Sequence, residues 1–192
     1  MATALVWLRR DLRLKDNPAL AQALADGFQP VLVYIHAPHE ESPWAPGAAS
    51  MAWLHHSLIS LGKDIGNVGG RLLLAQGDSL AELERIQALS KSQALYFSNL
   101  YEPALQARDA LVQQSFERKG IAVQRSNSSL LFEPWQIRTG AGTPYKVFTP
   151  FWRNALSQLQ LRAEYGQPTK LPEPAGIPGL TVNDLNLLPE TN

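Results

Sequence analysis

The chain has 192 residues, with 17 basic and 17 acidic side chains, and therefore a formal net charge of zero. Such a chain does not attract nucleic acid or an anionic membrane surface through its overall charge. It contains no cysteine, which excludes disulfide bonds and thiolate metal sites and fits a reducing compartment such as the cytoplasm.

The length fits one domain followed by a tail, or a piece of a larger protein. No apolar run approaches the roughly 20 residues that are needed to cross a bilayer. Residues 1–4 lead directly into a predicted strand, without the basic and apolar regions of a signal peptide. We therefore expect a monomeric, cytoplasmic protein that makes no membrane contact.

Short apolar runs bounded by charged or turn residues recur along the first 124 residues, and each is typical of a strand buried on both faces. The predicted strands are 5–8, 30–35, 71–75, 94–97 and 121–124. Segments with helical spacing of apolar residues separate them: 18–26, a helix through Met51 and Ile65, one beginning at Ser79, and 103–119. This alternation predicts an α/β fold, a doubly wound five-stranded parallel sheet of Rossmann-like type with helices on both faces. The first strand should be central, with the switch point between it and the fourth.

Local signals support these helices. Asn17 and Pro18 are a favourable N-cap and first helical residue. Gly27 and Gly120 can end helices in a left-handed conformation. Ser79 with Glu82 is the pattern of a capping box, which predicts Ser79 as an N-cap.

The pattern changes after residue 124. Two aromatic-rich stretches, 130–135 and 145–152, flank a loop at 139–144, and a short helix is predicted at 152–165. From residue 166 the chain is rich in proline, glycine and polar residues, as in a linker. The expected organisation is an α/β domain at 1–130, an extension that completes it at 131–165, and a linker at 166–192.

Motifs of conventional enzymes are absent from the sequence. The first strand is followed by Arg9-Arg10-Asp11-Leu12-Arg13 instead of a G-x-G-x-x-G loop. Neither a P-loop nor a G-x-S-x-G elbow occurs. The four histidines show no spacing typical of a metal site, so no metal is predicted.

The charged loop after the first strand has two interpretations. Asp11 and Asp16 can pair with the arginines and with loop amides, which would stiffen a turn. Alternatively, the arginines form part of a ligand site together with His36, Trp44 and Tyr101, whose loops are expected at the same edge of the sheet. Aromatic faces and cations suit a flat, conjugated, partly anionic small molecule.

Four stretches in order resemble the photolyase/cryptochrome family. They are the opening V-W-L-R-R-D-L-R-L-x-D-N-P-A-L, residues 53–58, Tyr101-Glu102-Pro103 with Arg108-Asp109, and residues 145–152. The resemblance covers about residues 1–165. Within the family, the sequence resembles above all the bacterial class I photolyases, which repair cyclobutane pyrimidine dimers. It implies an amino-terminal antenna domain that holds a light-harvesting chromophore, either methenyltetrahydrofolate or a deazaflavin.

The resemblance implies that the whole protein is a deoxyribodipyrimidine photo-lyase, which repairs dimers by blue-light-driven electron transfer from reduced flavin. The FAD, the dimer pocket and the DNA-binding groove belong to a later helical domain that this sequence lacks. The resemblance therefore implies no catalytic residue here, DNA contact only through the missing domain, and no repair activity of this chain alone.

The resemblance also implies which residues contact the chromophore. These lie after the second strand, at the start of the second helix and after the fourth strand: Ile35, His36, Ala37, Ser50, Met51, Leu100, Tyr101, Glu102 and Leu105. The Asn-Glu pair of folate-binding members is replaced by Ala104 and Leu105. Glu102-Pro103 matches deazaflavin-binding members, but Leu100 replaces a polar residue, so the identity of the antenna stays open. Arg9 to Arg13 are expected to brace the site.

Two other functions fit the same domain. A cryptochrome contains the same domain and uses light to change its binding partners. A stand-alone nucleotide-binding α/β module would require a glycine-rich phosphate loop at the first or fourth strand, which the sequence does not contain.

Overall fold

The computed structural model describes residues 2–174 and 176–189. Its elements in chain order are β1 (Thr3–Leu8), α1 (Pro18–Ala25), β2 (Gln29–His36), the 3-10 helix η1 (Pro38–Glu41), α2 (Ala48–Asn67), β3 (Leu73–Gln76), α3 (Ser79–Ser90), β4 (Ala94–Ser98), α4 (Pro103–Arg118), β5 (Ala122–Ser126), α5 (Phe148–Gln158) and the 3-10 helix η2 (Asn183–Leu185). No helix in these described ranges is long and apolar enough to cross a membrane.

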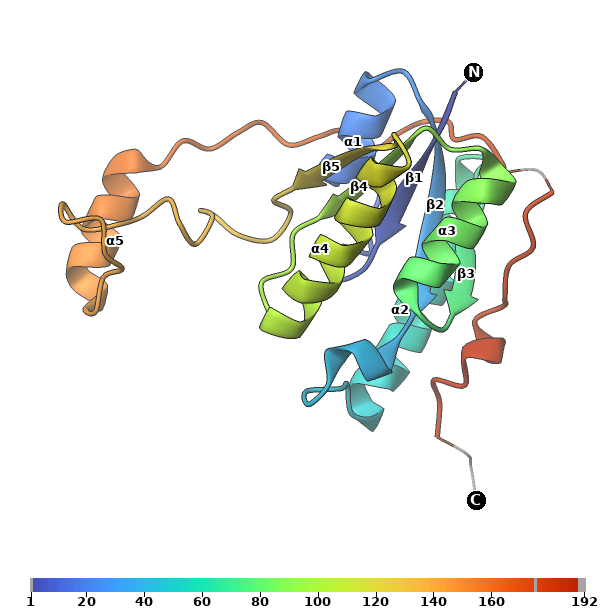
Figure 1. The fold of residues 1–192 in the computed structure, drawn as a ribbon, viewed down its shortest axis with the longest axis horizontal. Coiled ribbons are helices and arrows are strands. Elements are labelled where there is room, and N and C mark those ends of the chain that lie inside the picture. The colour runs from blue at the N-terminus through green and yellow to red at the C-terminus, as the bar shows by residue number, and fades with distance from the viewer. Residues whose placement is uncertain (1, 175, 190–192) are drawn as a thin grey trace. The chain divides into compact units, whose positions relative to one another are not determined.

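The five strands form one parallel sheet in the order β3-β2-β1-β4-β5 (Figure 1). The predicted fold is therefore confirmed, with β1 at the centre and the strand order reversing between β1 and β4. In the register, Trp7 of β1 lies beside Val33 of β2 and Phe97 of β4. The carboxyl ends of β1, β2 and β4 consequently meet at one edge of the sheet, where ligands bind in folds of this kind.

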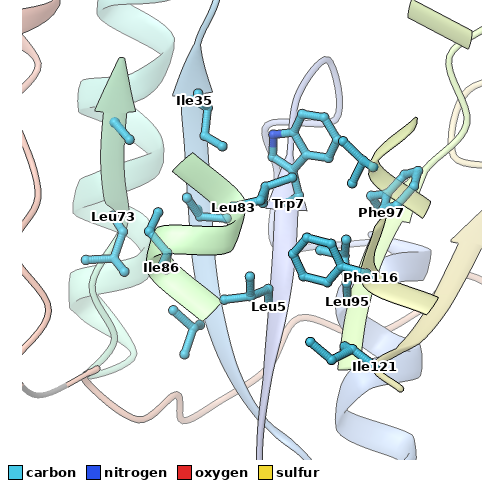
Figure 2. Close-up of a cluster of buried hydrophobic side chains, with 14 of the residues drawn as sticks. Leu5, Trp7, Ile35, Leu73, Leu83, Ile86, Leu95, Phe97, Phe116 and Ile121 are labelled. Atoms are coloured by element: carbon cyan, nitrogen blue, oxygen red, sulfur yellow. The ribbon is translucent and has the colours of Figure 1, made fainter. Parts of the chain in front are cut away.

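Alternate side chains of the strands point to opposite faces of the sheet, and a hydrophobic core lies on each face. Leu5 and Trp7 pack with Leu83 and Ile86 of α3 and with Phe116 of α4 (Figure 2). The neighbouring residues of β1 face the opposite side, where they pack with side chains of α1 and α2; the buried residues there include Ala4, Val6, Leu8, Leu20, Leu61 and Ile65. Helices therefore cover both faces, as the nearly continuous apolar strands predicted.

Several element boundaries differ from the predicted ones. Asp78, not Ser79, is the N-cap of α3, and its side chain accepts from the amide of Ala81. The predicted capping box is thus wrong, because Ser79 is occupied by a contact to Glu40 in a different loop. α5 begins at Phe148 and ends at Gln158, several residues before the expected positions at both ends.

The chain forms two compact units. The α/β unit contains the described residues up to Ser128 and again from Tyr165 onward, and the α5 unit is Ser129–Glu164. These boundaries lie within two residues of the expected ones, but the segment Ser129–Glu164 forms a unit of its own instead of an extension that completes the α/β domain. Within the α5 unit, Phe148 stacks on Trp152, with ring centroids 6.1 Å apart.

The segment after Tyr165 packs on the α/β unit instead of running as a free linker. Four of its side chains are buried, namely Leu171, Ile177, Leu185 and Leu187. The amide of Leu180 donates to the carbonyl of Leu74, which adds an antiparallel bridge at the β3 edge of the sheet. The apolar residues that make these contacts are too widely spaced to produce a helical or strand pattern in the sequence.

Candidate functional site

A cleft of about 670 Å³ lies at the carboxyl edge of the sheet, where the loops after β1 and β2 meet the start of α2. Its volume lies within the range of small-molecule sites, roughly 300–1,000 Å³. The lining residues come from four parts of the fold: Trp7, Arg9, Arg10, Leu12 and Arg13; Tyr34 to Pro38; Glu41, Trp44, Pro46, Ser50, Trp53, Leu54 and Ser57; and Leu100 and Arg108. The cleft combines apolar walls with four guanidinium groups.

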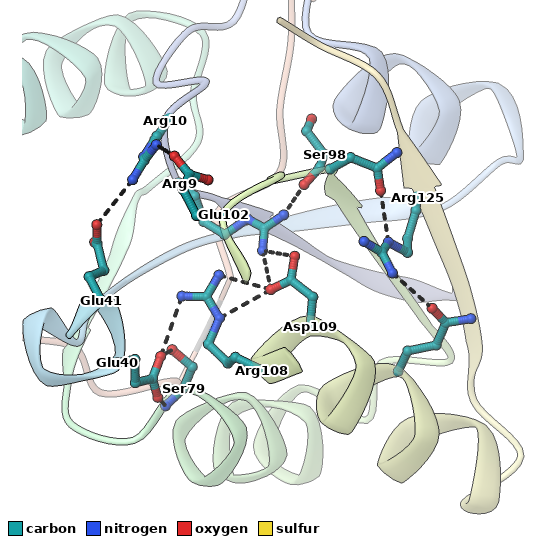
Figure 3. A network of polar contacts seen from close by, with 12 residues as sticks. Arg9, Arg10, Glu40, Glu41, Ser79, Ser98, Glu102, Arg108, Asp109 and Arg125 are labelled. Atoms are coloured by element: carbon teal, nitrogen blue, oxygen red, sulfur yellow. Dashed lines mark hydrogen bonds and ion pairs between the residues drawn. The ribbon is translucent and has the colours of Figure 1, made fainter. Parts of the chain in front are cut away.

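A buried ion pair with Asp109 holds Arg9, one of the lining residues, in place (Figure 3). Arg9 donates to both carboxylate oxygens of Asp109, at 2.7 and 2.9 Å, and also to the carbonyl of Ser98. Asp109 is fully buried, and Arg108 donates to it at 2.8 Å. Burial lowers the pKa of Arg9, and the charge of Asp109 opposes that shift. The carboxylate therefore stabilises two guanidinium groups at once.

The loop after β1 is braced by Asp11 and Asn17. Asp11 accepts from the amide of Arg9 at 3.0 Å and from the hydroxyl of Ser98 at 2.6 Å, which ties the ends of β1 and β4 together. Asn17 caps α1 by accepting from the amide of Leu20, and it donates to the carbonyl of Asp11. The contact of Asp11 with a loop amide agrees with the architectural interpretation, whereas the carboxylate of Asp16 accepts from the amide of Tyr165, outside the loop.

Glu40 fastens η1 to the start of α3. Its carboxylate accepts from the amide and hydroxyl of Ser79, at 2.7 and 2.6 Å, and lies 3.4 Å from Arg108. An acidic group at the amino end of a helix is favoured by the free amides and the helix dipole. Glu40 therefore holds the β2 loop in place beside the cleft.

Arg10 connects two loops at the mouth of the cleft. It donates to Glu41 at 3.1 Å and also to Glu102. Burial opposes the protonated form of Arg10, but the two carboxylates outweigh it and raise its pKa. Burial favours the neutral acid at Glu102, whereas hydrogen bonds from its own amide and from Arg10 lower its pKa. Because Arg10 is about half exposed, its ion pair with Glu102 contributes little to stability.

The walls of the cleft carry aromatic rings. Trp44 and Trp53 are 84% and 78% exposed, so large flat surfaces stand open to a ligand at the mouth. Tyr34 and His36 are buried deeper. Burial lowers the pKa of His36 and raises that of Tyr34, so both side chains are held neutral near neutral pH.

The structure brings five of the nine expected contact residues to the cleft: Ile35, His36, Ala37, Ser50 and Leu100. Met51 packs instead against the Tyr34 and Leu58 cluster, and Leu105 is buried in α4. Tyr101 and Glu102 are not among the lining residues, although Glu102 is bonded to Arg10. Whether these residues contact a chromophore stays a prediction.

Sequence reasoning missed several lining residues, above all Trp7 and Arg108. Trp7 lies in an apolar strand, so its pattern indicates core alone, and it is indeed 1% exposed. Arg108 lies on α4 and reaches the cleft because Asp109 and Glu40 hold its guanidinium there. The clustering of charge around the ends of β1 and β4 could have indicated Arg108, whereas no signal in the sequence separates Trp7 from an ordinary core residue.

The chemistry of the lining tests whether the cleft suits a conjugated cofactor. Trp44 and Trp53 offer exposed aromatic faces, and four guanidinium groups add positive charge. Aromatic faces stack on flat rings, and cations pair with anionic groups. The residues present therefore fit a flat, partly anionic antenna chromophore of either expected class.

Ligand-type side chains also converge outside the cleft. His39, Glu40 and Asp78 place one ligand atom each within 4.8 Å of one another, an arrangement that sequence spacing did not indicate because Asp78 comes from another loop. Glu40 already accepts from Ser79, and Asp78 caps α3. This cluster is therefore explained by the folding of the loops.

Comparison with known proteins decides the family. The sequence model described as DNA photolyase matches residues 4–175. The chain belongs to this family. A deoxyribodipyrimidine photo-lyase of Agrobacterium fabrum is 36% identical over 90% of the chain, and cryptochrome-1 of Arabidopsis thaliana is 37% identical over 80%. The chain spans 36% and 23% of the length of these two relatives.

The fold agrees with solved structures of the family. A class III photolyase from Agrobacterium tumefaciens matches 98% of the chain with a TM-score of 0.90 and 34% identity, and the chain covers 39% of it. The finer assignment to class I therefore stays a prediction, since this related structure belongs to a different class.

Proposed function

We propose that this chain is the light-harvesting domain of a photolyase and that the cleft at the carboxyl edge of the sheet binds its antenna chromophore. The observation that carries the proposal is a cleft of ligand size, with aromatic walls and four guanidinium groups, in a member of this family. When bound, methenyltetrahydrofolate or a deazaflavin would absorb near-ultraviolet or blue light and pass the excitation to a flavin.

The chain's own residues bind, orient and shield that ligand. Trp44 and Trp53 offer flat surfaces for its rings at the mouth of the cleft. Arg13 donates to the carbonyls of Asp16 and Ser128, and its guanidinium is bonded to no carboxylate of the described chain. It therefore provides a positive charge for an anionic part of the ligand. His36, held neutral by burial, adds a polar group without charge.

The activity of the whole protein belongs to the same proposal. We infer that the complete polypeptide is a deoxyribodipyrimidine photo-lyase, with FAD and the DNA-binding groove in a helical domain that this sequence does not include. The 36% identity to a named photo-lyase supports this. On this proposal the present chain is a cytoplasmic monomer without catalytic residues, which neither repairs dimers nor binds duplex DNA tightly.

A titration of the purified protein tests the proposal. Methenyltetrahydrofolate and a deazaflavin are added separately, and binding is followed through the absorption and fluorescence of the added compound. We expect saturable binding of one of them. Ser50→Trp, at an exposed position on the cleft wall, should weaken it at least tenfold by filling the mouth.

The matched control is Ser60→Trp, an exposed position on the same helix that does not line this cleft. This variant should bind like the wild type. If neither compound binds the wild type, or if Ser50→Trp binds as tightly as Ser60→Trp, the cleft is not the antenna site.

Cryptochrome is the second candidate for the whole protein. The 37% identity to cryptochrome-1 favours it as strongly as the photo-lyase match favours repair. Light-dependent repair of dimers by the complete polypeptide separates the two functions. Repair under blue light supports the photo-lyase, whereas flavin photoreduction without repair supports the cryptochrome.

A further inference from the structure

We infer that Glu41, together with Tyr34 and His36, selects an uncharged ring edge that carries two neighbouring N–H donors, as a 2-amino-4-oxopyrimidine does. Of the two expected chromophore classes, the folate has such an edge and the deazaflavin does not. This inference rests on the proposed function and names the ligand class that the same cleft prefers.

The first observation is a single negative charge in the wall of the cleft. Among the lining residues that the structure describes, Glu41 is the only acidic one, whereas four are arginines. Its Oε2 accepts from Arg10 at 3.1 Å (Figure 3). The side chain is 27% exposed, and no group of the described chain donates to Oε1. Because a carboxylate has about four acceptor positions, Glu41 can accept further hydrogen bonds from a ligand.

The second observation is a pair of buried polar side chains without partners. Tyr34 and His36 alternate along β2 and therefore point to the same face of the sheet. They are 9% and 5% exposed, both line the cleft, and neither the hydroxyl nor the imidazole makes a hydrogen bond within the described residues. The unpartnered atoms that are sealed from solvent belong to other residues, so these two polar groups stay accessible. Buried polar groups generally have partners, and a ligand in the cleft can supply them.

The third observation is that Glu41 acts on both of these side chains. Burial raises the pKa of Tyr34 and lowers that of His36, and the charge of Glu41 adds to the first shift and opposes the second. The hydroxyl and the neutral imidazole can each donate and accept, whereas the carboxylate only accepts. The three groups together therefore suit a ring edge that directs donors at Glu41 and that is not itself anionic.

The two chromophore classes differ at the edge that such a set of groups would contact. The pyrimidine ring of a folate presents its N3–H and its 2-amino group as two parallel donors, which match the two oxygens of a carboxylate. A deazaflavin presents an imide, whose one N–H lies between two carbonyl oxygens. A carboxylate facing the imide meets at least one of these oxygens, and the two negative groups repel each other. Glu41 therefore favours the folate edge and disfavours the deazaflavin edge.

A purely structural role explains Glu41 less well. Its ion pair with Arg10 is exposed to solvent and adds little stability, and Arg10 keeps its contact with Glu102 when Glu41 is removed. Neither contact accounts for the unpartnered Tyr34 and His36 beside the carboxylate. Recognition of a ligand edge accounts for all three.

The first test changes one group of the ligand. Fluorescence titrations of the purified protein compare pterin-6-carboxylate with lumazine-6-carboxylate, which has an oxygen in place of the 2-amino group. We expect the pterin to bind at least tenfold more tightly, because the lumazine places a carbonyl oxygen against Glu41. Methenyltetrahydrofolate and a deazaflavin are titrated in the same way, and the folate should bind more tightly.

The second test changes one group of the protein. Glu41→Gln keeps the size of the side chain and replaces an acceptor oxygen by an NH2 donor. The dissociation constants of methenyltetrahydrofolate and of the pterin should rise at least tenfold, while those of the lumazine and the deazaflavin stay equal or fall. The matched control is Glu82→Gln, which also removes one partner of an arginine but does not line the cleft. This variant should bind all four compounds like the wild type.

Tyr34→Phe tests the second group of the set. It removes a hydroxyl that has no partner among the described residues, so the midpoint of thermal unfolding should not fall. The affinity for the pterin should fall about threefold to tenfold, as for the loss of one hydrogen bond between neutral groups. An unchanged affinity would exclude Tyr34 from the contact and overturn its part of the inference.

The possible results separate the two claims. If the wild type binds the deazaflavin more tightly than the folate, the inference is overturned and the proposed function stands. The same conclusion follows if Glu41→Gln keeps the wild-type ratio of the dissociation constants of these two compounds. If the wild type binds neither of them, the proposed function fails and the inference fails with it.

Discussion

Asp109→Asn tests whether a buried carboxylate holds Arg9 in place beside the cleft. The change keeps the size of the side chain and removes its charge. Arg9 then retains, among the described residues, the Ser98 carbonyl as the acceptor for its guanidinium. Arg108 still has Glu40 at 3.4 Å. The loss therefore falls mainly on the pair between Arg9 and Asp109.

Removing one partner of a buried ion pair costs about 3–5 kcal/mol, because the other charge stays buried. For a protein of roughly 150–250 residues, each kcal/mol lowers the unfolding midpoint by about 2–4 °C. We therefore expect the midpoint of Asp109→Asn to fall by roughly 6–20 °C. The affinity of the cleft for its ligand should fall as well, because Arg9, one of its guanidinium groups, loses the carboxylate that holds it in position.

Thermal and urea unfolding followed by circular dichroism measure this change. Asp64→Asn, an exposed position on α2, is the matched control and should change the free energy of unfolding by less than about 0.5 kcal/mol. A loss below about 1 kcal/mol for Asp109→Asn would refute the reasoning, since it would mean that water or other groups solvate Arg9 in the folded state.

Three further predictions concern other parts of the chain. Leu171→Ala should lower the free energy of unfolding by about 2–5 kcal/mol, because truncating a buried side chain leaves a cavity. The control Leu161→Ala, at an exposed position, should change it little. Urea unfolding measures both values. Arg10→Ala should cost less than about 1 kcal/mol in the same assay, since its ion pairs are solvent-exposed, and a larger loss would contradict that view. Burial lowers the pKa of His36, so an NMR titration should place it below about 6.5. As the pH falls below about 6.5, His36 takes up a proton more readily in the unfolded chain than in the folded one. The wild type should therefore lose stability relative to His36→Gln as the pH falls. If both proteins show the same pH dependence, the pKa of His36 is not lowered.

The sheet and its helices were predictable from the sequence because their signals are local. Each strand is a short apolar run, and α2 carries Leu58, Leu61 and Ile65 at helical spacing. The N-cap at Asn17 follows from residue type and position alone. Strand order required only the general preference of alternating strands and helices for a doubly wound sheet.

The interior of the site was less predictable because its contacts join distant residues. Arg9 and Asp109 are 100 positions apart, and nothing in either local pattern indicates that they pair. The contact between Glu40 and Ser79 was equally unpredictable. The hydroxyl of Ser79 donates to Glu40 and does not form the predicted capping box. Trp7 is the clearest example. Its place in an apolar strand predicts a core residue, and nothing in that pattern indicates that its side chain also lines a cleft.

The α5 unit leaves and rejoins the rest of the chain at one place. Arg13 donates to the carbonyl of Ser128, and the backbone of Tyr165 is bonded to Asp16, so a single stretch of four residues holds both junctions. A segment inserted between adjacent attachment points can change in length or content without altering the path of the chain on either side. We therefore expect that a short glycine-serine loop can replace residues 129–164 without changing the path of the α/β unit.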